Sequence, residues 1–274
     1  MTTPLAPEMQ AALDAAARAG EVVLAHYHTF SAIPDARSDI STQADRDSQE
    51  TILKLLHGRF PADSLCAEER TPSLALAPAG APRTWIVDPI DGTRGFAKKN
   101  GEFSVMIALL AEERIQLGVV LEPATARLTY ALRGGGCWRK DQADATPRPC
   151  RVRAVIALSE AVLAQSHTHS PGRQTRLASA IAPAHIRETY SAGVKLALVA
   201  RGEADLYLNT YEKFHDWDIG AGHILVEEAG GQVTGLHGEP IQYSEGSGQR
   251  SGLLASNGRL HARTLEVIRA AESS

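Results

Sequence analysis

The sequence predicts a layered α+β or α/β fold in which helices pack on two sheets. Three observations support this prediction: two helical patterns open the chain, a run of strand-like segments follows, and the remainder alternates strand and helix. Helices that cover the faces of sheets are the simplest packing for such a series. We therefore expect an N-terminal half over residues 1–150 with an antiparallel sheet, and a C-terminal α/β half over residues 151–274.

The first segments of the chain are predicted helices. Apolar residues recur over residues 7–27 at the spacing of an amphipathic helix. A second helical pattern has an apolar stripe from Ile52 to Leu56 and ends before Pro61. Because Ser, Thr and Asp residues precede this stripe as N-cap signals, Asp45 is expected near the start of the second helix.

Strands are predicted next. "SLCA" forms a short strand before Glu68 and Glu69, and the Pro-, Ala- and Gly-rich residues 71–82 are expected to form an exposed, mobile loop. The strand over residues 84–88 then runs into a loop that carries two aspartates. Successive antiparallel strands are expected over residues 102–111, 114–123 and 127–139, and residues 140–151 are the best linker candidate.

Beyond the linker candidate, strands and helices alternate. The expected strands are residues 152–158, residues 204–209 and a segment near residue 252. The expected helices are residues 172–182, 193–202 and 218–231, the last of which ends at Gly230-Gly231.

The composition excludes several classes of function. The chain has 274 residues, of which 43% are hydrophobic and 22% charged, and its formal net charge is -4. Because there is neither a basic excess nor a block of Lys and Arg, we expect no binding of a nucleic-acid polymer, although a single nucleotide is a possible ligand. The longest apolar runs, such as residues 105–111, are far below the ~20 residues that cross a bilayer, so no integral membrane association is expected.

The N-terminal segment carries acids and lacks a basic stretch followed by a continuous apolar run. It therefore does not resemble a signal peptide, and a cytoplasmic location is expected. Three cysteines, Cys66, Cys137 and Cys150, lack the spacing of a metal site. They are expected to be buried or partly buried free thiols.

Two aspartates, Asp88 and Asp91, stand three residues apart where the strand over residues 84–88 ends. A turn that contains proline can direct both carboxylates to one side, where their repulsion must be offset by a positive charge. Oxygen ligands suit a hard cation such as Mg²⁺, which binds between carboxylates and a substrate phosphate. An isolated pair more often forms an ordinary turn and cap, so the metal hypothesis depends on further acids nearby.

Further candidates stand elsewhere in the sequence. Glu68 and Glu69 end the preceding strand, and Asp218 begins a predicted helix. Alone, Asp218 would be a helix N-cap, but the same helix end could bind a phosphate. Thr93 could offer a hydroxyl and a backbone N–H to a phosphate or a water, and its alternative role is again an ordinary cap.

Three motifs together closely resemble the inositol monophosphatase superfamily of Mg²⁺-dependent, lithium-inhibited phosphatases. They are "AEE" at 67–69, "DPIDGT" at 88–93 and "WDIGAG" at 217–222, in the family's order and approximate spacing. The similarity covers nearly the whole chain. It implies an αβαβα sandwich with a metal site at the junction of the two halves, and the activity of a phosphoric monoester hydrolase.

The resemblance assigns the metal ligands. Glu68, Asp88 and the backbone carbonyl of Ile90 would bind one Mg²⁺, and Asp88, Asp91 and Asp218 would bind the second. Glu68 would also help to bind a third, weaker ion. The expected cofactor is therefore two or three Mg²⁺ ions.

The resemblance also assigns the catalytic groups. These groups are Asp45, Thr93 and Glu68. Thr93 paired with Asp45 would orient and deprotonate the attacking water. Clustered cations lower the pKa of water, hold the phosphate and stabilise the departing oxygen in an in-line displacement. The paired acids at residues 88 and 91 then have a function that a turn alone would not give them.

The substrate side is similar to a narrower group. Thr93-Arg94-Gly95-Phe96 resembles the Thr-Lys-Gly-Phe of 3'(2'),5'-bisphosphate nucleotidases, whereas inositol monophosphatases usually carry Thr-Asn-Phe. Residues 164–170 and 191–208 resemble segments of the same nucleotidases. The implied substrate-binding residues are Gly92, Thr93, Arg94, Ser166, His167, Gly193 and Lys195. Without the resemblance, Ser166 and His167 would be an exposed turn and Lys195 a solvated helix residue.

These observations predict a phosphomonoesterase that hydrolyses adenosine 3',5'-bisphosphate to AMP and phosphate. An inositol monophosphatase or another sugar-phosphate phosphatase would share all the metal ligands and is the nearest alternative. A non-catalytic module would be expected to have lost one of the aspartates. Homodimers are common among relatives, so the resemblance suggests a homodimer. His215 and His223 are expected to be packing or surface residues.

Overall fold

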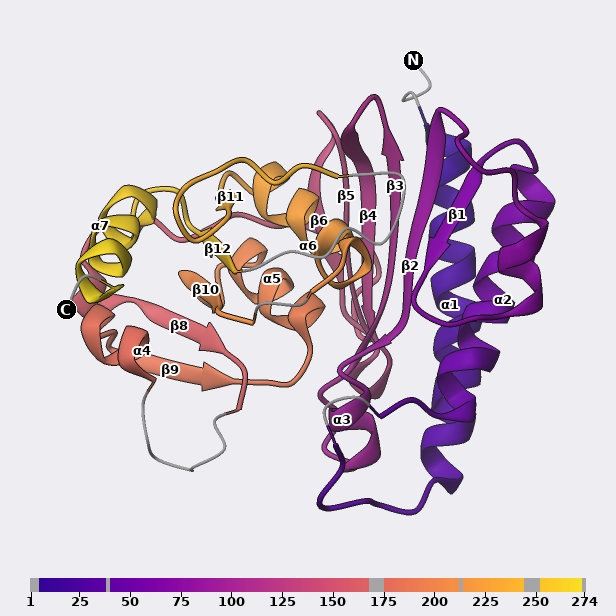
Figure 1. Ribbon diagram of the computed structural model, residues 1–274, viewed down its shortest axis with the longest axis horizontal. Helices are drawn as coiled ribbons and strands as arrows, with labels where there is room; N and C mark the ends of the chain where they lie inside the picture. The colour runs from indigo at the N-terminus through magenta and orange to yellow at the C-terminus, as the bar shows by residue number, and fades with distance from the viewer. Residues whose placement is uncertain (1–4, 38–39, 168–174, 212–213, 244–251, 273–274) are drawn as a thin grey trace.

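A computed structural model describes residues 5–37, 40–167, 175–211, 214–243 and 252–272. Helices and sheets alternate in layers, and the predicted layered fold is confirmed (Figure 1). Helices α1 (Ala6–Thr29) and α2 (Gln43–Arg59) cover one face of the first sheet, α5 (Ala192–Ala200) and α6 (Asp216–Glu228) lie between the sheets, and α4 (Arg176–Ile181) and α7 (His261–Glu272) cover the second sheet.

The first sheet has seven strands in chain order. They are β1 (Ser64–Ala67), β2 (Arg83–Asp91), β3 (Ser104–Ala111), β4 (Arg114–Glu122), β5 (Arg127–Leu132), β6 (Gly136–Lys140) and β7 (Arg148–Pro149). Strands β1 and β2 are parallel and all the following pairs are antiparallel. The expected antiparallel sheet is therefore confirmed, and the short helix α3 (Thr93–Ala97) follows directly after β2.

The second sheet has five strands in the order β11-β12-β10-β8-β9. They are β8 (Val162–Gln165), β9 (His185–Glu188), β10 (Leu206–Asn209), β11 (Gln232–Thr234) and β12 (Leu253–Ser256). Strand β8 runs parallel to both neighbours, and β12 is antiparallel to β10 and β11. All strands of the first sheet precede residue 150, and we propose residues 1–150 and 151–274 as the two units of the chain.

Glycines allow the central helices to approach their neighbours closely. A Cβ atom on Gly118 of β4 would lie 2.4 Å from the carbonyl oxygen of Ala221 in α6. A Cβ atom on Gly222 of α6 would lie 2.4 Å from Leu196 Cδ1 in α5. Close packing of this kind leaves little freedom to shift. It therefore fixes the first turn of α6, which carries Asp218, relative to the first sheet.

The described residues differ from the sequence-based expectations in four segments. Residues 71–82 are not simply an exposed loop, because they contain a 3₁₀ helix (Pro72–Leu76), and Thr71 and Ser73 are buried. Ser73 donates its hydroxyl to Glu50 of α2 at 2.7 Å. The two aspartates at residues 88 and 91 belong to β2 rather than to a loop.

The third and fourth differences lie around the linker candidate. Residues 140–151 contain β7, which pairs with β6, and Asp141 within them forms ion pairs with Arg127 and Arg148. Residues 152–158 form no strand, because the chain pairs with the second sheet only from Val162 onward. Strands β8, β9 and β11 and helix α7 had no counterpart in the sequence-based expectations, and the single strand expected over residues 127–139 is two strands, β5 and β6. Residues 172–174 of one expected helix lie outside the described chain.

Among the described residues, no helix combines the length and the apolar character that crossing a membrane requires. The three cysteines are free thiols, of which Cys66 is partly buried and the other two are buried, as expected.

Candidate active site

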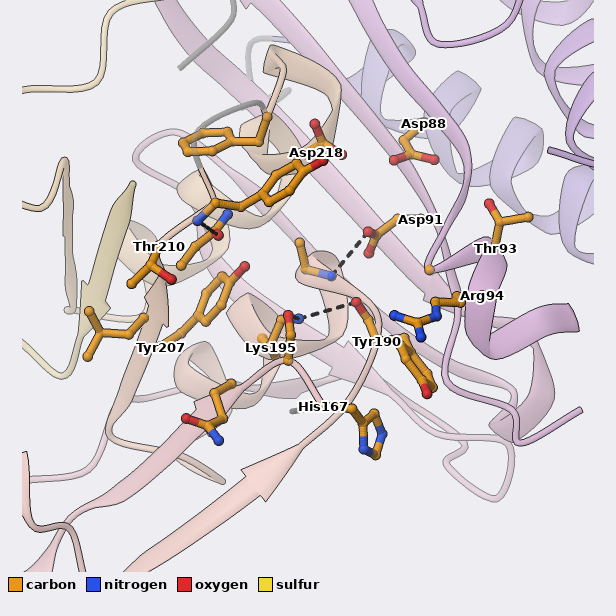
Figure 2. A pocket seen from close by; sticks show the side chains of 18 of the residues that line it. Asp88, Asp91, Thr93, Arg94, His167, Tyr190, Lys195, Tyr207, Thr210 and Asp218 are labelled. Atoms are coloured by element: carbon orange, nitrogen blue, oxygen red, sulfur yellow. Dashed lines mark hydrogen bonds between the residues drawn. The ribbon is translucent and has the colours of Figure 1, made fainter. Parts of the chain in front are cut away.

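A cavity of about 820 Å³ lies where the two sheets meet. Its walls come from the end of β2, from α3, from the starts of α5 and α6, and from β8 and β10. Figure 2 shows that the labelled side chains of both halves surround a common space. The site therefore depends on contacts between segments that are far apart in the sequence.

Three carboxylates gather on one wall of the cavity. Asp88, Asp91 and Asp218 each place a carboxylate oxygen within 4.8 Å of the other two. Asp88 and Asp91 are buried, while Asp218 is half-buried in the first turn of α6. Figure 2 shows the three side chains around the same space.

An irregularity in β2 explains why two residues three positions apart share a side. In a regular strand, residues i and i+3 point to opposite faces of the sheet. The pairing of β2 with β3 shifts register between Asp88 and Asp91, and an irregularity of this kind re-aims side chains. The hydroxyl of Ser48 on α2 donates to the carbonyl oxygen of Pro89 at 2.9 Å, which holds the irregular segment against the helix.

The Asp91 carboxylate is held by the start of α5. It accepts backbone N–H bonds from Ala192 at 3.1 Å and Gly193 at 2.7 Å, and hydroxyl bonds from Ser191 and Ser104. Donors at a helix N-terminus stabilise a carboxylate and fix its direction. A Cβ atom on Gly193 would lie 2.6 Å from Met106 Sδ, so glycine is needed for α5 to come this close.

The metal-free cluster is electrostatically unfavourable. Burial raises the pKa of Asp88, Asp91 and Asp218, that of Asp218 to about 7, and the neighbouring acids raise the pKa of Asp88 further. Burial and the charge of Asp218 raise the pKa of Glu68 to about 8, although Glu68 is open to water at the cavity mouth. Cations that bind oxygen ligands would remove this repulsion, and the acidic cluster therefore fits the divalent ions that phosphatases use.

This electrostatic arrangement predicts the pH dependence of the metal-free protein. Unfolded carboxyls have pKa values near 4, whereas Asp218 and Glu68 have values of about 7 and 8 in the fold. Over most of the range from pH 6.5 to 8.5 the folded chain therefore holds more protons than the unfolded chain, and its free energy of unfolding falls as the pH rises. Lys195, whose pKa burial lowers to about 8, loses its proton more readily in the fold and opposes this fall only near the upper end of the range. In EDTA we expect the Tm to be roughly 5 °C lower at pH 8.5 than at pH 6.5.

Scanning calorimetry with and without Mg²⁺ tests this expectation. Added Mg²⁺ should restore the Tm at pH 8.5, and Asp218→Asn should weaken the pH dependence in EDTA. The buried ring of His261 has a pKa lowered to about 4, so its contribution lies below this pH range. A metal-free Tm that is flat or rises across the range would contradict the proposed repulsion.

Glu68 lines the same cavity from the loop after β1, but it lies outside the group of three aspartates. The side chain of Gln49 on α2 fixes this loop. Its amide donates to the carbonyl oxygen of Glu69 at 2.6 Å and accepts from the backbone N–H of Glu69 at 2.8 Å. The sequence offered no signal for Gln49 or for Ser48, because their role depends on how α2 packs on β1 and β2.

A hydroxyl and a carboxylate meet beside the cluster. Thr93 Oγ1 lies 2.9 Å from Asp45 Oδ1 and 2.9 Å from the carbonyl oxygen of Ile90. Because a hydroxyl has one proton, it can donate to only one of these acceptors at a time. Thr42 donates its backbone N–H and its hydroxyl to Asp45 Oδ2 in the N-cap of α2, which directs Oδ1 toward Thr93.

The residues proposed for substrate binding separate into two groups. The cavity wall includes Gly92, Thr93, Arg94, Ser166, His167 and Lys195. Gly193 is not on this wall; its backbone N–H donates to the carboxylate of Asp91 instead. The residues 168–170 of the segment that contains His167 lie outside the described chain.

Lys195 is buried rather than solvated. Its residue surface is 1% exposed, and its ammonium group donates to Ser166 Oγ at 2.9 Å and to the carbonyl oxygens of Thr189 and Tyr190 at 3.0 and 3.2 Å. Burial lowers the pKa of Lys195 to about 8. Since three bonds occupy all three protons, a substrate would have to replace one of these acceptors.

One rim of the cavity is built around Tyr190. The His167 ring lies 4.4 Å from the Tyr190 ring, and the guanidinium of Arg94 lies 5.3 Å from it on a cation–π contact. Glu102 accepts from His167 at 2.7 Å and from the backbone N–H of Tyr190 at 3.2 Å. Figure 2 shows Arg94, His167 and Tyr190 together on the side of the cavity away from Asp218.

The remaining wall is largely apolar and aromatic, and sequence reasoning did not identify it. Its residues come from β8, α4, β10 and the segment after β10. They are Leu163, Leu177, Ala178, Tyr207, Leu208, Tyr211 and Phe214. The aromatic residues of "YLNTYEKF" at 207–214 were a signal for this wall. His215 and His223 do not line the cavity: His215 stacks on Trp217, and His223 packs against Tyr243.

A layered fold with clustered carboxylates and an adjacent hydroxyl–carboxylate pair defines the class of metal-assisted phosphoric monoester hydrolases. The chain belongs to the inositol monophosphatase family, whose model matches residues 5–273. This membership confirms the resemblance found in the motifs, and the family is generally metal-dependent.

Individual relatives have several functions. The chain is 32% identical over 244 residues to the Nus factor SuhB of Pasteurella multocida, which covers 85% of this chain and 86% of the relative. It is 30% identical over 235 residues to the 3'(2'),5'-bisphosphate nucleotidase CysQ of Salmonella typhimurium, which covers 84% and 91%. The structure of an inositol monophosphatase from Anabaena matches with a TM-score of 0.80 at 28% identity and covers 98% and 97% of the two chains.

Proposed function

We propose that the protein is a Mg²⁺-dependent phosphomonoesterase that hydrolyses adenosine 3',5'-bisphosphate to AMP and phosphate. The observation that carries this proposal is the two-part cavity, which has acids at one end and an aromatic, apolar wall at the other. A compact polyol phosphate would leave the apolar wall unused. A nucleoside would fill it, since flat bases pack on aromatic rings.

In this proposal the acids hold the metal ions. Glu68, Asp88 and the carbonyl oxygen of Ile90 would bind one Mg²⁺, and Asp88, Asp91 and Asp218 would bind another, with Glu68 available to a third. When bound, such ions supply positive charge that makes water more acidic and neutralises phosphate oxygens. The raised pKa values in the metal-free protein support the assignment, because a cluster of this kind needs cations to be fully ionised.

The protein's own groups would orient the attacking water. Thr93 donates its hydroxyl proton to Asp45 and keeps its oxygen lone pairs for a hydrogen bond from the water. Asp45 is buried, and burial raises its pKa toward that of a useful proton acceptor. The pair therefore provides both the direction and the basicity that hydrolysis requires.

The opposite rim would bind the rest of the substrate. Arg94 offers a guanidinium on the Tyr190 ring, and Lys195 offers a buried ammonium group whose acceptor Ser166 could be exchanged for a phosphate oxygen. Gly92 precedes α3 with a φ of 86°, and a Cβ atom there would lie 2.7 Å from the backbone oxygen of Glu102, so only glycine fits at this part of the cavity wall. These groups are suited to a second phosphate, which inositol 1-phosphate lacks.

Sugar-phosphate hydrolysis is the second candidate, and the match to an inositol monophosphatase from Anabaena favours it. The discriminating measurement is the ratio of kcat/KM for adenosine 3',5'-bisphosphate and inositol 1-phosphate with Mg²⁺. We expect a preference of about 100-fold or more for the nucleotide, because the rim around Tyr190 and the aromatic wall would each add contacts that inositol 1-phosphate does not make. A preference for the inositol ester would contradict the proposed substrate and leave the proposed metal mechanism in place.

A variant of the cavity rim separates base recognition from phosphate recognition. Tyr211 lines the cavity and is 61% exposed, so Tyr211→Ala should leave the fold intact. We expect kcat/KM for the nucleotide to fall about tenfold, in line with the usual contribution of base stacking, and that for inositol 1-phosphate to stay the same. Equal losses for both substrates would show that Tyr211 does not recognise the base.

A further inference from the structure

A second cavity lies at the other end of α5, away from the acidic cluster. It has a volume of about 350 Å³ and is lined by Arg139, Arg148, Pro149, Cys150, Arg151 and Arg201. Helix α5 has nine residues, so it is about 14 Å long, and it begins beside Asp91 and ends immediately before Arg201. The arginine cavity and the active site are therefore separate places on the molecule.

Arg201 has hydrogen-bonding capacity that the protein does not use. Its side chain is 0% exposed, and Nη1 donates to Glu122 at 2.5 Å and to Thr129 at 3.0 Å. Nε lies 3.0 Å from a carboxylate oxygen of Glu203 without forming a hydrogen bond. Nη2 is also buried and has no hydrogen-bond partner. Buried donors are nearly always satisfied, and Arg201 lines the second cavity, so its two unpaired nitrogens indicate an acceptor from outside the chain.

The surrounding charges also leave a positive excess. Glu203 forms ion pairs with Arg127, Arg139, Arg187 and Arg201 at once. The carboxylates that pair with this arginine network are Glu122, Asp141, Asp144 and Glu203, which makes four acids. The arginines are the four that pair with Glu203 together with Arg148 and Arg151, which makes six. Among the described residues Arg151 has no hydrogen bond or ion pair.

We infer that the arginine cavity binds a phosphate group. A guanidinium with a free N–H edge matches the oxygens of phosphate, and several guanidiniums around one oxyanion are a common form of phosphate recognition. A phosphate would supply the hydrogen-bond acceptor that Arg201 lacks. Its negative charge would also offset the excess of arginines around the cavity. The phosphate group comes either from free orthophosphate, a product of the family's reaction, or from a nucleotide.

Calorimetric titration with orthophosphate in EDTA tests this inference. Without cations the acidic cluster repels phosphate, so the titration reports on the arginine cavity and does not depend on whether or what the enzyme hydrolyses. We expect one phosphate per wild-type chain. Binding should weaken at least tenfold in Arg148→Met, whose side chain is 51% exposed, and in Arg201→Lys, which keeps the charge but loses the planar fork.

Arg263→Met is the matched control, because Arg263 lies on α7 and pairs only with Glu266 among the described residues. It should bind phosphate as the wild type does. A parallel titration with AMP, judged by the part of the binding that Arg148→Met removes, identifies the source: tighter binding of AMP to the arginine cavity indicates a nucleotide phosphate, and equal or weaker binding indicates orthophosphate. No binding of either ligand, or binding that survives both Arg148→Met and Arg201→Lys, overturns the inference.

Discussion

The variant Asp91→Asn is expected to release phosphate at least about 10³-fold more slowly than the wild type. Asp91 is the proposed ligand whose orientation the fold controls most closely, since the start of α5 and two serine hydroxyls direct its carboxylate. A neutral amide binds Mg²⁺ poorly, and loss of an ion removes several kcal/mol of charge stabilisation from the transition state. At about 1.4 kcal/mol per factor of ten, three kcal/mol or more gives this loss.

The fold should survive this change. The amide relieves repulsion within the metal-free cluster, but its single oxygen can accept only one of the backbone N–H bonds from Ala192 and Gly193. Because these two effects oppose each other, we expect the Tm in EDTA to change by no more than about 5 °C. Steady-state kinetics and calorimetry on the same preparation provide the measurement. Asp47→Asn is the matched control, because Asp47 lies on α2, is half-exposed and pairs with His26 away from the cavity. Turnover by Asp91→Asn equal to that of Asp47→Asn would remove the basis for the metal assignment.

The three carboxylates on one wall of the cavity could be predicted from sequence, because each stands in a short motif that local signals identify. Asp88 and Asp91 belong to one strand, and Asp218 stands at a recognisable helix start. Their convergence was expected from motifs that resemble a known family. The register shift in β2 brings Asp88 and Asp91 to the same side. This shift could not be predicted, because a proline between two acids suggests a turn as readily as an irregular strand.

The apolar wall of the cavity could not be predicted because it is assembled from distant segments. Leu163, Leu177 and Tyr207 come from three elements that meet only when the second sheet forms. The burial of Lys195 has the same origin. A lysine in an apolar helix is usually solvated, but here the turn over residues 189–190 closes over it and supplies two carbonyl oxygens.

Errors in the fold prediction also follow from the difference between local and long-range signals. Residues 152–158 have the apolar, β-branched composition of a strand, yet they pair with none, and the first strand of the second sheet begins only at Val162. Side chains such as Val155 and Leu158 pack on the core without strand pairing. Composition predicts burial here, and only the sheet order decides which buried segment becomes a strand.

Replacement of Thr93 by valine tests the proposed water-positioning pair. Valine keeps the shape of the side chain but removes the hydroxyl that lies 2.9 Å from Asp45 and from the Ile90 carbonyl oxygen. Because general-base assistance typically contributes 10²–10⁴-fold, we expect kcat to fall by about 10³-fold. The Mg²⁺ concentration for half-maximal activity should change little, since Thr93 contributes no carboxylate to the cluster.

A double-mutant cycle distinguishes a catalytic pair from two separate structural effects. If Thr93 and Asp45 act as a unit, Asp45→Asn should cost about as much as Thr93→Val, and the double variant should be hardly slower than either single variant. Thr51→Val is the matched control, because Thr51 also donates its hydroxyl on α2, but to the carbonyl oxygen of Asp47 and not into the cavity. Additive losses, or a kcat of Thr93→Val close to that of the control, would assign the water's activation to another group in the cavity.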